Sequence, residues 1–273
     1  MAFHSDKSQH LDKIGNVKKL AILTSGGDSQ GMNATIRAIT RVAIYHGIDV
    51  YGIYEGFNGL IQGGEMIRRL SWDHVSGIIQ KGGTILGTAR CKEFHDKKGR
   101  RCAIQNLLLN KIQYLCVIGG DGSLTGASLL SDEFDEHCLT ICEMQSIPDI
   151  ASISSKMTFL NVLGIVASID NDMCDIDMTI GTDSALHRII DAADSIKTTA
   201  GSHQRVFIIE VMGRRCGHLA LMSALTTEAD YLFIPEVVIN ISKVNIIYLH
   251  ATLVWLLPNG SCSSLGASDL PYV

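Results

Sequence analysis

Short aliphatic runs recur along the chain, and each ends in a glycine or a polar turn. The runs are Leu20–Leu23, Val50–Tyr54, Tyr114–Ile118, Leu163–Ala167, Val206–Val211 and Tyr231–Ile234. Apolar runs of roughly four to eight residues between turn signals are typical of buried strands. The pattern therefore predicts a strand at each run.

Segments with helical spacing lie between several of these runs. Apolar residues share one face from Met32 to Ala43, and another helix is expected to begin near Asp183 or Ser184 as its N-cap. Residues 131–156 predict a helix followed by a loop around Pro148. Strands that alternate with helices indicate a layered α/β fold with a mostly parallel sheet. In such folds, ligands bind at the carboxyl ends of the strands.

The composition excludes several classes of protein. Apolar residues make up 46% of the 273 residues and charged residues 19%, which favours a folded core over disorder. The net charge of −5 gives no positive field that would attract nucleic acid or an anionic membrane. The most apolar stretch, Ile246–Leu257, has twelve residues, whereas a bilayer span needs about 20. We therefore expect neither a nucleic-acid partner nor a membrane partner.

Cysteine usage indicates a reducing compartment. The eight cysteines include no CxxC pair, and a chain of this size does not need disulfides for stability. The polar start, MAFHSDKSQHLDKIGN, lacks the apolar segment of a signal peptide. These features predict reduced thiols and a cytoplasmic protein.

Two of the predicted strands end in glycine-rich turns, at Gly26-Gly27-Asp28 and at Gly119-Gly120-Asp121-Gly122-Ser123. Without Cβ atoms, backbone N–H groups can approach a phosphate, and a helix N-terminus adds a favourable dipole. The carboxylate of Asp121 is suited to hold Mg²⁺ against nucleotide phosphates. Taken alone, the first turn is better explained as an ordinary tight turn. The second indicates nucleotide phosphate more than any particular substrate, because GGDG turns also occur in NAD kinases and lipid kinases.

An acidic turn, Ser168-Ile169-Asp170-Asn171-Asp172, follows another predicted strand. Two carboxylates two residues apart can face one cavity, one as a base and the other near a metal. Their mutual repulsion raises one pKa, which suits a base. A solvated acidic turn explains the segment equally well, because Asp175 and Asp177 follow directly.

Basic residues are needed to balance a phosphate, and three lie beside strands. Arg90, Arg205 and Arg214 are the candidates, since a guanidinium can hold a phosphate at two points. The charged residues at 97–101 predict a solvated face instead. His203 and His218 are interpreted as hydrogen-bonded structural residues, because neither has a second metal ligand at helical spacing.

Seven motifs lie between about Lys18 and Glu236: LTSGGDSQGMNATIR, GGTILGTAR, IGGDGS, SIDND, TIGTDSALHRI, SHQR and EVMGRRCG. In this order they resemble the ATP-dependent 6-phosphofructokinase family, particularly the N-terminal catalytic half of the animal-type enzymes. The resemblance implies an α/β fold of two lobes, a tetramer, and transfer of the γ-phosphoryl group of MgATP to the 1-hydroxyl of fructose 6-phosphate. It argues against a different GGDG kinase.

The resemblance also implies a role for each matching residue. The ATP contacts would be Gly26, Arg90, Cys91, Gly120, Asp121, Gly122 and Ser123, with Asp121 at Mg²⁺. Asp170 would accept the proton of the sugar hydroxyl, and Asp172 would help to orient the metal or the base. The substrate contacts would be Ser168, Ile169, Asp170, Arg205, Met212, Gly213 and Arg214, with Arg214 at the transferring phosphate and Arg205 reaching the 6-phosphate across a subunit boundary. Pyrophosphate-using relatives tend to carry an aspartate and a lysine where this chain has Gly122 and Ala167, so ATP is favoured as the donor.

The motif resemblance ends at Glu236. We expect a polar arm at residues 1–17, a phosphofructokinase-like catalytic region at 18–236 whose second lobe is incomplete, and a divergent tail of unpredicted fold at 237–273. Family members carry further sugar-phosphate ligands after the matching segment, so we expect little or no turnover from these residues alone. Two hypotheses stay open: a glycolytic 6-phosphofructokinase, and a non-catalytic form or fragment that binds nucleotide without turnover.

Overall fold

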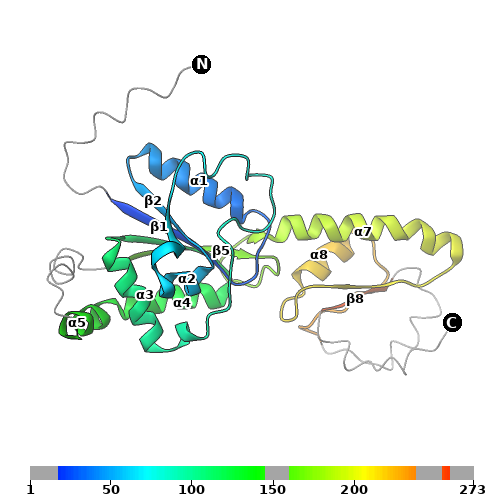
Figure 1. The fold of residues 1–273 in the computed structure, drawn as a ribbon. Helices are drawn as coiled ribbons and strands as arrows, with labels where there is room; N and C mark the ends of the chain where they lie inside the picture. Colours follow the sequence, from blue (N-terminus) through cyan, green and yellow to red (C-terminus); the bar gives the residue numbers. More distant parts are fainter. Residues whose placement is uncertain (1–17, 145–159, 238–253, 259–273) are drawn as a thin grey trace, which may run out of the picture. The chain divides into compact units, whose positions relative to one another are not determined.

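The computed structural model describes residues 18–144, 160–237 and 254–258. The chain forms two structural units, Met1–Ala167 and Ser168–Val273 (Figure 1). No helix in the described ranges is both long and apolar enough to cross a membrane.

The first unit is built around a mostly parallel sheet. Its strands are β1 (Lys19–Ser25), β2 (Asp49–Ile53), β3 (Ile67–Leu70), β4 (Tyr114–Gly119) and β5 (Asn161–Ser168), in the spatial order β3-β2-β1-β4-β5. β1 pairs in parallel with β2 and β4, and β4 pairs in parallel with β5, whereas β3 runs antiparallel to β2. The predicted α/β fold with a mostly parallel sheet is confirmed.

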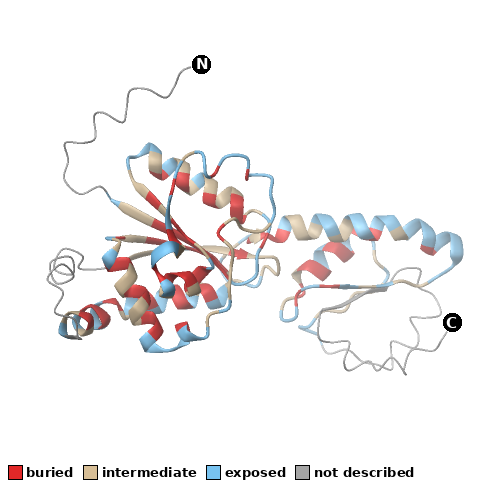
Figure 2. Cartoon of the chain, viewed as in Figure 1, coloured by how far each residue is buried: buried red, intermediate tan, exposed pale blue. Residues whose placement is uncertain are grey.

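Helices cover both faces of this sheet (Figure 1). α1 (Met32–Tyr45) lies on one face, and α2 (Gly56–Gln62), α3 (Lys97–Leu109) and α4 (Asp121–Asp132) lie on the other, with α5 (Phe134–Met144) packed against α3. Two short 3-10 helices, η1 (Gly64–Met66) and η2 (Glu93–His95), lie in the connections. Ala21 and Leu23 of β1 belong to the core on the side of α2 to α5. Ile22, which lies between them in the sequence, is also buried but does not belong to that core. Both faces of β1 are therefore covered (Figure 2).

The second unit contains β6 (Ile180–Gly181), α7 (Thr182–His203), β7 (Ile208–Val211), α8 (His218–Thr227) and β8 (Val254–Pro258). β8 pairs in parallel with β7, which places one strand within the tail whose fold the sequence did not predict. α7 and α8 pack together around a small core that includes Ala193, Leu219 and Ala224.

Two predictions of secondary structure need correction, and one strand was missed. Tyr231–Ile234 forms no strand beyond an isolated bridge at Tyr231, and Pro235, which has no N–H to donate, follows directly. α7 begins at Thr182 after Gly181, whose φ of 111° is left-handed, so neither Asp183 nor Ser184 is its N-cap. β3 was not predicted, because its two central arginines are exposed. The predicted helix after Ser131 corresponds to α5, and the loop around Pro148 lies outside the described residues.

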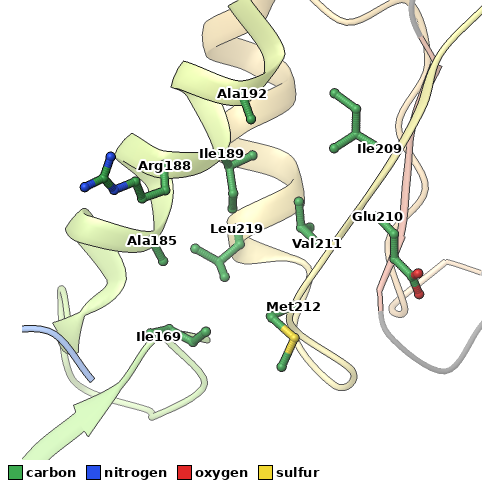
Figure 3. Close-up of a pocket in the computed structure, with 10 residues that line it drawn as sticks. All are labelled: Ile169, Ala185, Arg188, Ile189, Ala192, Ile209, Glu210, Val211, Met212 and Leu219. Atoms are coloured by element: carbon green, nitrogen blue, oxygen red, sulfur yellow. The ribbon is translucent and has the colours of Figure 1, made fainter. Parts of the chain in front are cut away.

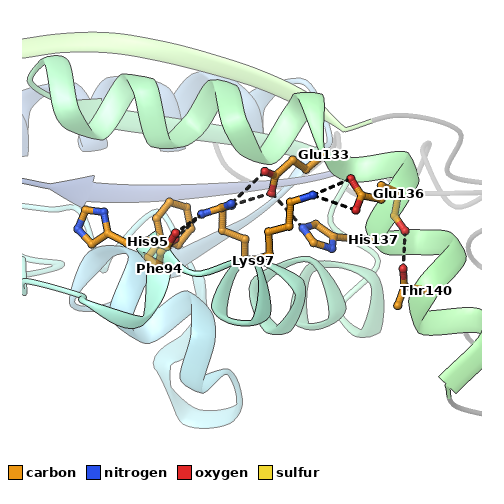
Figure 4. A network of polar contacts seen from close by, with 8 residues as sticks. Phe94, His95, Lys97, Glu133, Glu136, His137 and Thr140 are labelled. Carbon is orange, nitrogen blue, oxygen red and sulfur yellow. Dashed lines mark hydrogen bonds and ion pairs between the residues drawn. The ribbon is translucent and has the colours of Figure 1, made fainter.

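The charged segment at residues 97–101 is not simply a solvated face (Figure 4). Arg100 is only 7% exposed. Its Nε and Nη2 donate to the Glu133 carboxylate at 2.7 and 2.9 Å. Its Nη1 donates to the carbonyl oxygens of Phe94 and His95 at 3.0 and 2.7 Å. Arg100 therefore ties α3 to both η2 and the start of α5.

Candidate active site

The turn after β1 brings Gly26 beside the turn after β4. In the parallel register Ser25 is opposite Gly119, so both strands end at the same edge of the sheet. A Cβ placed on Gly26, whose φ is +86°, would lie 3.2 Å from the Ser123 hydroxyl. The two glycine turns therefore meet, as the sequence predicts for ligand-binding turns in an α/β fold.

The second turn presents the N-terminus of α4. Gly120 is the N-cap of this helix, and Asp121 and Gly122 are exposed in its first turn. A Cβ on Gly119 would lie 2.4 Å from the Ser25 carbonyl oxygen, so the close approach of the two strands requires glycine there. A helix N-terminus that exposes backbone N–H groups attracts an anion such as a phosphate.

The segment that carries Arg90 and Cys91 runs past the same edge. The Thr88 hydroxyl donates to the Gly26 carbonyl oxygen at 2.7 Å, and the Thr24 hydroxyl contacts the Gly87 carbonyl oxygen at 2.8 Å. Arg90 is exposed, whereas Cys91 packs against the core. The residues predicted to bind ATP are thus gathered within the first unit, around the ends of β1 and β4.

The acidic turn belongs to the second unit from Ser168 onward. Oδ1 of Asp170 is buried and has no hydrogen-bond partner among the described residues. Burial raises the pKa of the Asp170 carboxyl, and the charge of Asp172 raises it further. The Ser168 hydroxyl accepts from the Asp170 N–H at 3.3 Å and donates to Asp172 at the same distance. A half-buried carboxylate with a raised pKa is suited to accept a proton.

The predicted sugar-binding residues are only partly brought together. Ile169 and Met212 line one cavity of about 350 Å³, together with Arg188 from α7 and Glu210 from β7 (Figure 3). Gly213 has a φ of +118°, and a Cβ there would lie 2.5 Å from the Cys216 carbonyl oxygen, so this turn requires glycine. Arg205 and Arg214 are exposed and do not line the cavity.

Several polar residues near these turns were missed or misread from the sequence. Arg188 and Glu210 lie within the motifs TIGTDSALHRI and EVMGRRCG, but the sequence analysis assigns them no role, and it is the folded second unit that places both at the cavity. Thr179 and Thr182 are buried and hydrogen-bond to the backbone of the acidic turn. Nε2 of His218 is buried without a hydrogen-bond partner in the described ranges, so the hydrogen-bonded interpretation is wrong for that atom.

Comparison with known proteins identifies the family. The phosphofructokinase family model matches residues 19–250, past the end of the motif resemblance at Glu236. This chain belongs to the phosphofructokinase family. Over 228 residues it is 55% identical to the human liver-type ATP-dependent 6-phosphofructokinase and 56% identical to the mouse platelet type. The phosphofructokinase of Saccharomyces cerevisiae has a similar structure, with a TM-score of 0.83 and 42% identity over 89% of this chain.

The phosphofructokinases that it matches are much longer. The match covers 84% of this chain but 29% of the two mammalian relatives, and 34% of the yeast chain. The chain therefore spans about a third or less of the length of these family members.

Proposed function

We propose that this protein is an ATP-dependent 6-phosphofructokinase, which transfers the γ-phosphoryl group of ATP to the 1-hydroxyl of fructose 6-phosphate in glycolysis. The observation that carries the proposal is the meeting of two glycine turns at the carboxyl ends of β1 and β4, where Gly26 adjoins Ser123. The mammalian relatives named above, which are ATP-dependent 6-phosphofructokinases, support the choice of reaction.

On the nucleotide side, N–H groups at the start of α4 bind phosphate oxygens. Gly120 and Gly122 permit a close approach, and a Cβ on Gly122 would meet no atom within 4 Å. Ser123 and Gly26 border the same space, and the exposed guanidinium of Arg90, next to Cys91, neutralises phosphate charge. With glycine at 122 and alanine at 167, this space is open enough for adenosine, which favours ATP over pyrophosphate.

Asp121 would hold the Mg²⁺ that arrives with ATP, and Asp172 would help to orient the metal or the base. The described residues contain no group of three or more His, Cys, Asp or Glu side chains that could hold a metal by themselves. The single carboxylate of Asp121 fits Mg²⁺, which in such sites is bound by one or two carboxylates together with substrate phosphates. When bound, the ion neutralises charge on the transferring phosphoryl group.

On the sugar side, Asp170 accepts the proton of the 1-hydroxyl. A general base works best when its pKa lies near the working pH, and burial moves the pKa of Asp170 in that direction. Ser168, Ile169 and residues 212–214 contact the sugar, with Arg214 at the transferring phosphate. Arg205 binds the 6-phosphate of a neighbouring subunit, in a cytoplasmic homo-oligomer such as the tetramer of the family.

Calorimetric titration with ATP, with and without Mg²⁺, tests the nucleotide site. Asp121→Asn should weaken Mg²⁺-dependent ATP binding by at least about tenfold, because it removes a charged contact. Asp132→Asn, at the other end of α4, is the matched control and should bind like the parent chain. Equal affinities for the parent chain and Asp121→Asn would overturn the assignment.

A coupled assay for fructose 1,6-bisphosphate tests the transfer step. Where the parent chain shows turnover, Asp170→Asn should lower it by about 10²–10⁴-fold, the usual contribution of a positioned base, and leave ATP affinity unchanged. If the parent chain shows turnover and Asp170→Asn removes it, the result supports the proposal that the chain is a kinase. ATP binding by the parent chain without turnover supports the alternative, a form that binds nucleotide but does not transfer its phosphoryl group.

A further inference from the structure

Two buried threonines contact the backbone just before Asp170. Thr179 is 3% exposed and Thr182 is fully buried. The Thr179 hydroxyl donates to the Ser168 carbonyl oxygen at 2.5 Å, and the Thr182 hydroxyl lies 3.3 Å from the same oxygen and 3.2 Å from the Ile169 carbonyl oxygen. The two hydroxyls are 2.7 Å apart. Both carbonyl groups that precede Asp170 therefore have hydroxyl partners from the start of α7 and the residues before it.

The residue after Asp170 is held from the same direction. Asn171 has a left-handed backbone, with a φ of 54°. Its side-chain oxygen accepts from the Thr179 N–H at 2.9 Å, and its side-chain nitrogen donates to the Asp177 carbonyl oxygen at 3.3 Å. Segment 177–182 thus fixes the backbone on both sides of Asp170.

The Asp170 carboxylate receives no comparable support. Its Oδ1 has no partner among the described residues, although the atom is buried. The direction of this carboxylate is therefore set through the backbone of the turn rather than through hydrogen bonds to the carboxylate itself. A displacement of about 1 Å at a reacting group can lower a rate by about 10²-fold, so such backbone contacts matter for catalysis.

We propose that Thr179 and Thr182 are positioning residues, which hold the turn so that Asp170 faces the substrate hydroxyl. The proposal rests on the proposed function, because it assigns the reaction's base to Asp170. Neither threonine touches the reacting atoms. Their hydroxyl groups, rather than their methyl groups, carry the role.

The test compares Thr179→Val, Thr179→Ser and Thr227→Val in the full chain. Valine keeps the shape of threonine and removes the hydroxyl, whereas serine keeps the hydroxyl. Thr227 is the matched control, because it is 2% exposed and its hydroxyl donates to the Ser223 carbonyl oxygen at 2.9 Å on α8. Thr179→Val removes two hydrogen-bonding contacts, to Ser168 and to Thr182, and Thr227→Val removes one, so we expect both variants to lower global stability and Thr179→Val to lower it more.

Hydrogen exchange of the amides at 168–172 and NMR titration of the Asp170 carboxyl provide readouts independent of turnover. Thr179→Val should speed exchange in this turn by at least tenfold and shift the Asp170 titration, whereas Thr179→Ser and Thr227→Val should leave both near the parent values. In the coupled assay, Thr179→Val should lower kcat by about 10–100-fold at unchanged KM for ATP.

The failure of the proposal and the failure of the proposed function give different results. If the parent chain shows no turnover, the kinase assignment fails for this chain, while exchange and titration still report on the turn. If Thr179→Val matches Thr227→Val in exchange, titration and kcat, the positioning role is refuted.

Discussion

Replacing Glu133 by alanine tests how the first unit holds the segment that follows Arg90 and Cys91. The Glu133 carboxylate accepts two hydrogen bonds from Arg100 and lies 3.0 Å from Nε2 of His137, which is fully buried. The side chains of Arg100 and Glu133 are 9% and 16% exposed, so solvent screens this pair only weakly. Because Arg100 also binds the carbonyl oxygens of η2, loss of Glu133 should loosen three elements together.

The expected cost follows from the contacts that remain. Removing one partner of a buried ion pair costs about 3–5 kcal/mol, because the other charge stays buried without compensation. Nη1 of Arg100 keeps its bonds to Phe94 and His95, so we expect the lower end of that range, about 3 kcal/mol. With a urea m-value of about 2 kcal/mol per M, the midpoint of unfolding should fall by about 1.5 M.

Urea unfolding at neutral pH, followed by circular dichroism, measures this change. Arg100→Met, Glu133→Ala and the double variant form a cycle in which the two single effects should not add, because each removes the same pair. Glu136→Ala is the matched control. Glu136 pairs with Lys97 between the same two helices, but these side chains are 60% and 58% exposed, so the expected cost is below about 1 kcal/mol.

Two results would refute this account of the ion pair. One is a urea midpoint for Glu133→Ala no lower than that for Glu136→Ala. The other is strict additivity of Glu133→Ala and Arg100→Met, which would mean that the two residues stabilise the unit independently.

Three further outcomes are expected. The hydrogen bonds from Arg100 lower the pKa of Glu133 from 4.5 to about 2. The stability that this carboxylate contributes above pH 4.5 should therefore be lost as the pH falls toward 2, and urea midpoints measured across this range should show the loss. Glu133→Gln should remove this pH dependence. Gly119→Ala should lower the free energy of unfolding by about 1–3 kcal/mol, because its Cβ would lie 2.4 Å from the Ser25 carbonyl oxygen; an unchanged thermal midpoint would contradict this. Burial raises the pKa of Cys116 to about 12. In the folded protein, iodoacetamide should therefore leave Cys116 unmodified and modify the exposed Cys174. Equal labelling of the two thiols in peptide mass spectrometry would contradict the burial of Cys116.

The parts of the fold that the sequence predicts correctly have local signals. β1 and β4 are short apolar runs followed at once by glycines, and the strand, the turn and the start of the helix lie within a few residues of one another. Parallel pairing then places both turns at one edge of the sheet without further information. The predicted location of the nucleotide-side residues follows from this local pattern.

The wrong predictions concern residues whose partners lie far along the chain. Arg100 lies within a run of charges that suggests a solvated face, and only its pairing with Glu133, 33 residues later, shows why it is buried. The sequence pattern carries no trace of that pairing. β3 was missed for a related reason, because an edge strand with exposed arginines lacks the apolar run that marks the central strands.

Asp170 depends both on a local sequence signal and on contacts with residues further along the chain. Its place directly after a strand is visible in the sequence. Residues 177–182 satisfy the surrounding backbone, while Oδ1 of Asp170 has no partner in the part of the chain that the structure describes. A buried polar atom without a hydrogen bond is destabilising, and native structures contain few of them. Here several hydrogen bonds hold the turn, while Oδ1 of Asp170, the atom that would meet a substrate hydroxyl, has none from the described residues. This contrast supports the role of base proposed for Asp170, because a purely structural acidic turn would be expected to use its carboxylate in the hydrogen bonds that hold the turn.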